Sequence, residues 1–189
     1  MKRLWLVALL VLPAFLLVSE ASATPTVPSQ LLTRSQLSSG WSRYDIAAAD
    51  TATCPESSFR APVSSSAARV VFVERSSETL LLEKLQSVSD PVVAYAAAVA
   101  NVTDCRRTDA QIDGLPAYQR INPVNLGSYL VPVRAFSIMA TVGFVSVAGC
   151  VAYALKGHVV VAFGELTMGS VNARQFKRLL TRALARISA

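Results

Sequence analysis

The sequence predicts an α+β fold, in which an antiparallel sheet has a kinked helix and a C-terminal helix packed against it as an α/β sandwich. Three observations support this prediction. Residues 136–147 alternate apolar and small or polar side chains, which is typical of a half-buried strand. Lys156-Gly157 separates two apolar runs, as a tight hairpin turn does. Apolar residues recur every three or four positions along residues 172–187, which predicts an amphipathic helix at the C-terminus.

Residues 1–23 have the three parts of a cleavable secretory signal peptide: a basic start, an apolar run and small residues before the cut. We expect cleavage after Ala23. The apolar run is shorter than the roughly 20 residues that cross a bilayer, and Pro13 interrupts it, so an uncleaved anchor is disfavoured. The first cysteine is Cys54, which argues against a lipid anchor at the cut. We therefore expect a protein secreted into a periplasm-like space or the cell envelope, without a stable transmembrane anchor.

Residues 24–31 predict a flexible leader, and residues 32–189 have the length of a single globular domain. The chain has 18 basic and 12 acidic residues, with a formal net charge of +6. Removing the signal peptide leaves it basic. This balance favours anionic partners such as phospholipid headgroups or acidic glycans. Nucleic acid is a poor candidate for an exported chain, and composition does not determine the oligomeric state.

The first half of the domain predicts one strand and one helix. Residues 31–41 indicate a short helical turn, and residues 44–66 an irregular loop rich in Ala, Ser, Thr and Pro. The β-branched and aromatic run at residues 68–76 predicts a strand. Residues 77–102 predict a helix kinked at Asp90-Pro91, because proline interrupts one helix and can begin the next. The second part of this helix is apolar on all sides, so we expect it to be buried.

The second half predicts a series of strands and a final helix. After a loop at residues 104–114, strands are expected at residues 117–122, 129–135, 136–147, 150–155 and 158–163. Asn172 and Gln175 have the spacing of a capping box at the start of the last helix.

Three cysteines in an oxidising compartment allow one disulfide and one spare thiol. Counting does not separate the three possible pairings. Cys54 and Cys105 have polar, turn-rich surroundings, whereas Cys150 begins an apolar run where an inert buried thiol is common. We expect a Cys54–Cys105 disulfide and a free Cys150.

The sequence contains no constellation that names a reaction, so we expect no catalytic residues, metal or cofactor. His158 is the single histidine, and a solvated hairpin position is the simplest interpretation of it. Ser146 lies between glycines that are too far apart for a nucleophile elbow. The loop at residues 104–114 mixes three aspartates with arginines, which is typical of a solvated turn rather than a glycosidase pair. No glycine-rich phosphate-binding motif is present.

The most regular pattern is a stripe of four arginines spaced four residues apart on the C-terminal helix. Its members are Arg174, Arg178, Arg182 and Arg186. This spacing stacks the cations on one helix face with no acidic residue among them. Guanidinium groups bind phosphate and carboxylate groups in a bidentate way, so Arg174, Arg178 and Arg182 are our candidate ligand-binding residues. The alternative is a solvated outer face.

From Ser66 onwards the chain resembles the extracellular sensor domain of the mycobacterial kinase PknH and its secreted or lipid-anchored relatives. The resemblance lies in an early cysteine (Cys54), an alanine-rich helix ending near Cys105, and the run 149–161, which places a cysteine, a strand, a basic turn and a second strand before the last helix. It implies an α/β sandwich with a cleft that receives a ligand and no enzymatic activity. Members usually have two disulfides, and their last cysteine often lies at the end of the final strand, near Leu166, where this chain has none. The resemblance therefore implies that Cys150 is the unpaired cysteine.

These observations predict an exported, non-catalytic sensor or ligand-binding domain of the actinobacterial cell envelope. We expect its cleft to bind a lipid or an anionic glycan or phosphate ligand. A secreted envelope hydrolase is one alternative and requires an acid and a nucleophile facing His158. A structural interaction protein is another, and it predicts a flat apolar patch without a pocket.

Overall fold

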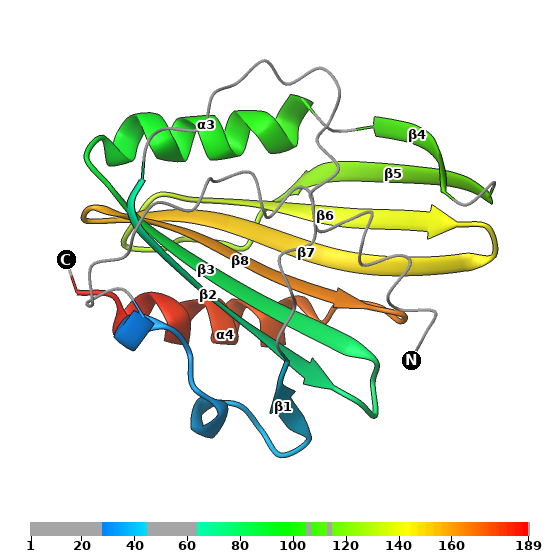
Figure 1. The fold of residues 1–189 in the computed structure, drawn as a ribbon, viewed down its shortest axis with the longest axis horizontal. Helices are drawn as coiled ribbons and strands as arrows, with labels where there is room; N and C mark the ends of the chain where they lie inside the picture. The colour runs from blue at the N-terminus through cyan, green and yellow to red at the C-terminus, as the bar shows by residue number, and fades with distance from the viewer. Residues whose placement is uncertain (1–27, 45–63, 105–106, 113–114, 189) are drawn as a thin grey trace.

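The structure is a computed structural model that describes residues 28–44, 64–104, 107–112 and 115–188 (Figure 1). Short 3-10 helices and a short strand come first, and strands and two α-helices follow. In chain order, the elements are η1 Pro28–Gln30, η2 Arg34–Gln36, β1 Trp41–Arg43, β2 Ser64–Glu74, β3 Thr79–Val88, α3 Pro91–Asp104, β4 Arg107–Ile112, β5 Leu115–Val124, β6 Val133–Val142, β7 Val145–Lys156, β8 Val159–Thr167 and α4 Ala173–Arg186.

The described strands form one antiparallel sheet of eight strands in the order β1-β2-β3-β8-β7-β6-β5-β4. The last strand in the sequence, β8, lies between β3 and β7. Every residue of β8 is buried. The expected α+β class is confirmed: helices pack against an antiparallel sheet.

The two helices cover opposite faces of the sheet, so the domain has three layers (Figure 1). Alternate residues of β7 and β8 face different helices, as the two-residue period of a strand requires. Val161 and Phe163 belong to the core on the α4 side, where the Phe163 and Phe176 rings lie 5.4 Å apart. Ala162 and Leu166 belong to the core on the α3 side.

The first part of the predicted kinked helix is a strand. Residues 79–88 form β3, which pairs with β2 and β8 and is buried along almost its whole length. Its leucine, glutamate, lysine and glutamine side chains have good helix propensity, but sheet pairing on both edges overrides that preference. The turn before it contains Glu78 at φ 49 rather than a helix cap.

Helix α3 confirms the helix after Asp90-Pro91, with Asp90 accepting a hydrogen bond from the Val93 N–H. It is not buried on all sides, however. Ala94, Ala97, Asn101 and Val102 face the sheet, while Val92 and Val93 are 65% and 52% exposed. The helix lies on the surface of the sheet, so only one face needs to be covered.

Other boundaries differ from the sequence expectations. The loop expected at 104–114 contains strand β4, and the strand expected at 129–135 is mostly the connection between β5 and β6. The long strand expected at 136–147 divides at Gly143-Phe144 into β6 and β7, because Gly143 adopts φ 58 in a two-residue turn. The hairpin at Gly157 is present, with φ 56, and joins β7 to β8.

The C-terminal helix is confirmed almost residue for residue. The Asn172 side chain accepts hydrogen bonds from the Arg174 and Gln175 N–H groups, and helix α4 continues to Arg186. The residues just before β1 pack beneath it. Residues 28–31, expected in a flexible leader, include η1, and Leu31 and Leu32 join the core on the α4 side.

Candidate ligand-binding groove

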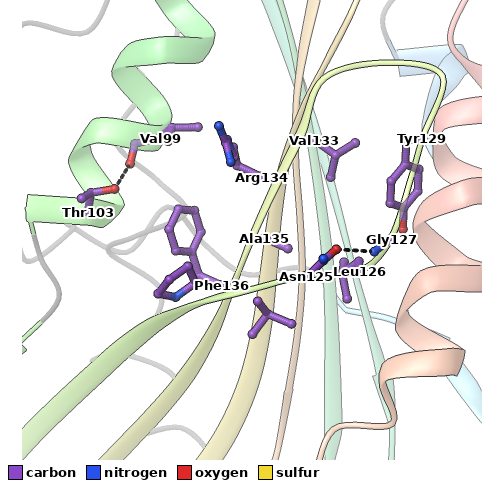
Figure 2. Close-up of a pocket in the computed structure, with 12 residues that line it drawn as sticks. Val99, Thr103, Asn125, Leu126, Gly127, Tyr129, Val133, Arg134, Ala135 and Phe136 are labelled. Carbon is purple, nitrogen blue, oxygen red and sulfur yellow. Dashed lines mark hydrogen bonds between the residues drawn. The ribbon is translucent and has the colours of Figure 1, made fainter.

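A groove of about 670 Å³ lies at the loop end of the β5–β6 hairpin (Figure 2). Helix α3 contributes Val99 and Thr103 on one side, and the β5–β6 connection contributes its other side. This volume is in the range that holds a small-molecule ligand. The remaining lining residues are Pro123, Val124, Asn125, Leu126, Gly127, Tyr129, Val133, Arg134, Ala135 and Phe136.

Most lining residues have apolar side chains, but polar atoms contribute about as much of the groove surface as apolar atoms do. Two of the polar side chains make hydrogen bonds within the protein. The Thr103 hydroxyl donates to the Val99 carbonyl at 2.9 Å, and the Asn125 side-chain oxygen accepts from the Gly127 N–H at 2.8 Å (Figure 2). Both bonds are local to their own helix or turn. They leave Arg134 as the one charged residue that lines the groove.

Arg134 lies on β6 opposite Tyr153 of β7, and Figure 2 shows its side chain directed toward α3. It is exposed, and among the residues described no hydrogen bond or ion pair occupies its guanidinium group. Its charge also acts on α3: burial raises the pKa of Tyr95, and the Arg134 charge partly offsets that rise. The groove thus offers a free cation next to apolar walls.

Lys177 of α4 lies close to the other end of the groove. Its Nζ lies 5.5 Å from the centre of the Tyr129 ring, and a Cβ added to Gly127 would lie 2.8 Å from the same atom. Gly127 also has φ +84, a conformation that other residues rarely adopt. Glycine at this position therefore lets the β5–β6 connection turn against Lys177.

The arginine stripe does not line this groove. Arg182 Nη1 donates to the Gln36 carbonyl at 3.0 Å, and Arg186 donates to the carbonyls of Ser29 at 2.7 Å and Gln30 at 3.3 Å. These two arginines fasten the segment before β1 onto α4. Arg174 and Arg178 are exposed and, within the described part of the chain, have no such partner.

His158 is exposed in the β7–β8 turn, where its backbone carbonyl accepts from the Val88 N–H. No described side chain hydrogen bonds to its ring, so the structure gives no acid or nucleophile to support the hydrolase alternative. Among the described residues, no group of three or more His, Cys, Asp or Glu side chains could hold a metal ion. No helix in the same residues is long and apolar enough to span a membrane.

Cys150 is a free thiol that is 5% exposed on the α4 side of β7. Burial, with a smaller contribution from Glu165, raises the pKa of this thiol to about 12. Cys54 and Cys105 lie outside the described residues, so their pairing stays a prediction.

The sequence interpretation did not find the groove residues. Val99 and Arg134 are far apart in the chain, and no local pattern joins them. One signal was present: Arg134 is the single charge within the apolar run 129–136. A charged side chain in such a run needs an exposed position or a partner.

The fold is similar to the crystal structure of the extracellular domain of PknH from Mycobacterium tuberculosis. The TM-score is 0.54 at 12% sequence identity, over 87% of this chain and 98% of that chain. The resemblance expected from the sequence is confirmed at the level of the fold. No family model matches the sequence, and the search of curated proteins gave no significant match.

Proposed function

We propose that this protein is an exported, non-catalytic domain that binds an anionic amphiphile of the cell envelope in the groove between α3 and the β5–β6 hairpin. The observation that supports this proposal most directly is the unpaired Arg134 guanidinium beside apolar walls. The fold similarity to an extracellular domain and the signal-peptide pattern of residues 1–23 support export.

The composition of the groove favours a ligand with one anionic group and an apolar body. Arg134 can hold a carboxylate or phosphate through two parallel hydrogen bonds. Val99, Leu126, Val133 and Phe136 can cover an acyl chain or a similar apolar body. A glycan would need many polar partners, and Thr103 and Asn125 already use part of their hydrogen-bonding capacity within the protein.

This proposal moves the anionic site from the arginine stripe to Arg134. Arg182 donates to a backbone carbonyl of the segment before β1, so it is engaged in holding the fold. Arg174 and Arg178 are exposed on α4 and do not line the groove. They serve as matched controls, since they are also exposed arginines.

Binding can be measured with cis-parinaric acid, a fatty acid whose fluorescence rises when its chain leaves water. We expect the wild-type protein to bind this probe and Arg134→Gln to bind it about ten times more weakly or less, since a hydrogen bond to a charged group contributes ~1.5–3 kcal/mol. Arg178→Gln should bind as the wild type does. Lauric acid should compete with the probe, and methyl laurate, which lacks the charge, should compete poorly.

A second variant tests the location independently of charge. Val99→Trp places a large ring on the α3 wall, which is half-buried and can accept it toward the groove. It should reduce probe binding without unfolding the protein, as checked by circular dichroism. Equal affinity of wild type, Arg134→Gln and Val99→Trp would exclude this groove. Loss of probe binding in Arg178→Gln alone would instead place the anion-binding site on the arginine stripe of α4.

A further inference from the structure

At one end of the sheet, the hairpin between β6 and β7 continues past the end of β8, with β5 paired along its other side. The pairing of β7 with β8 ends at Ala148 and Thr167, whereas β6 and β7 continue to the pair Val142 and Val145. Three further pairs at about 3.3 Å per residue extend the hairpin by roughly 10 Å. Figure 1 shows this hairpin at the right-hand extremity of the molecule.

The apex of this hairpin carries a phenylalanine. Phe144 is 105% exposed at the second central position of the Gly143-Phe144 turn. Polar and small residues are the usual occupants of such turns. A fully exposed aromatic ring at this position does not contribute to the core. The side chains around it therefore indicate which kind of partner it could contact.

Two more exposed apolar side chains lie behind the apex on the α4 side of the sheet. Met139 of β6 is 57% exposed, and Tyr118 of β5 is 48% exposed. Tyr118 pairs with Thr141 and Arg120 with Met139, so Tyr118 and Met139 are diagonal neighbours on one face. Together with Phe144 they form an apolar tip, which we define as Tyr118, Met139 and Phe144.

The charge beside the apolar tip is positive. Arg120 is exposed and lies directly opposite Met139 on the same face. The chain as a whole has a formal charge of +6.

We propose that the apolar tip inserts into the interface of an anionic lipid bilayer. An aromatic ring at the apex, a tyrosine with an apolar body and polar end, and a flanking arginine are side chains that partition to the headgroup region. Positive charge beside them suits the negative surface of anionic lipids. A protein partner would not require the apolar groups to be at a projecting apex, which is the geometry that reaches into a lipid layer.

This surface is separate from the groove. Phe144 lies in the turn that follows β6, whereas Arg134 lies near the beginning of that strand. The hairpin turn contains no groove residue. Insertion of the apolar tip therefore leaves the groove free, and the two sites can be tested one at a time.

The test is cosedimentation with vesicles of phosphatidylglycerol and phosphatidylcholine, using variants made in the full-length chain and collected after export. We expect Phe144→Ser to lower the partition coefficient at least about tenfold, as loss of a buried phenylalanine side chain implies. Leu130→Ser is the matched control, because Leu130 is 107% exposed in the β5–β6 connection, and it should bind as the wild type does. Arg120→Gln should weaken binding to the anionic vesicles and leave binding to pure phosphatidylcholine unchanged.

A direct measurement of insertion uses Phe144→Trp. Its indole emission should shift to shorter wavelength on addition of anionic vesicles and be quenched by brominated acyl chains, while buried Trp41 provides an unchanged background. Equal partitioning of Phe144→Ser and Leu130→Ser would overturn the proposal. An indole that responds to a second copy of the protein but not to vesicles would also overturn it and assign the tip to protein association. Binding of cis-parinaric acid by Phe144→Ser separates this result from the groove.

Discussion

The side chain of Glu83, in the middle of β3, accepts a hydrogen bond from the backbone N–H of Leu32 at 2.6 Å. Glu83 is 1% exposed and lies within the core on the α4 side, below the segment that Arg182 and Arg186 hold. Burial raises its pKa to about 7, although the Leu32 N–H and the Arg186 charge act in the opposite direction. Glu165, in β8, has a pKa raised to about 7 by burial as well.

These two carboxyl groups predict that the protein is more stable in mild acid than at neutral pH. Between about pH 4.5 and pH 7 the folded state binds more protons than the unfolded state, because both folded pKa values exceed the ordinary value of 4.5. The free energy of unfolding should therefore fall as pH rises through this window. Urea denaturation at pH 4.5, 6 and 8 measures the slope.

Glu165→Gln should reduce this slope and raise the relative stability at pH 8. Its Oε2 atom is buried and has no hydrogen-bond partner among the described residues, so an amide removes a charge without breaking a bond. Glu78→Gln, at an exposed turn position, is the control. A wild-type stability that increases from pH 4.5 to pH 8 would contradict this account.

Arg186→Ala should loosen the segment before β1. The substitution removes the donors to the Ser29 and Gln30 carbonyls. It also removes the positive charge that lowers the pKa of Glu83, so the buried carboxylate becomes less favourable. We expect a loss of about 1–3 kcal/mol and faster amide exchange in residues 28–37, measured by mass spectrometry. Arg178→Ala, on the same helix, should leave exchange in that segment unchanged.

Gly149→Ala should destabilise the sheet centre. A Cβ at this position would clash with Leu166 Cδ2 and lie 3.0 Å from the Glu165 carbonyl oxygen. Since backbone atoms of β8 cannot move away freely, we expect a cost of about 1–3 kcal/mol in urea denaturation. Gly169→Ala has its nearest contact at 3.9 Å and should be close to neutral.

The thiol of Cys150 should be unreactive in the folded protein. It is buried and its pKa is raised to about 12, so little thiolate is present at pH 8. Iodoacetamide should modify it only after denaturation. Peptide mapping without reductant should then recover alkylated Cys150 and a linked pair of Cys54 and Cys105. A peptide linking Cys150 to either of the others would contradict both the pairing and the burial.

Local patterns in the sequence were sufficient for α4 and for the β7–β8 hairpin. The apolar stripe of α4 and its Asn172 cap are encoded within a few helical turns. Gly157 predicts the β7–β8 turn because glycine readily adopts the positive φ found there. Strand β3 was missed because residues 80–86 favour a helix when considered alone. Its conformation depends on β8, whose partner residues lie about eighty positions later.

The candidate site was harder to predict for the same reason. The arginine stripe was visible because its residues share one helix, yet two of its four members bind backbone carbonyls of the segment before β1. The groove joins Val99 of α3 to Arg134 of β6, and no local sequence pattern connects these two residues. Only the placement of α3 over the sheet brings them together.

The position of β8 also constrains when the chain can fold. Strands β1–β3 and β4–β7 each pair among themselves, but β3 and β7 meet only through β8, the last strand to be synthesised. Until residues 159–167 are available, the two groups of strands have no common partner, and closing the sheet requires a long-range search. The eight-stranded sheet therefore cannot be completed before residues 159–167 have been synthesised.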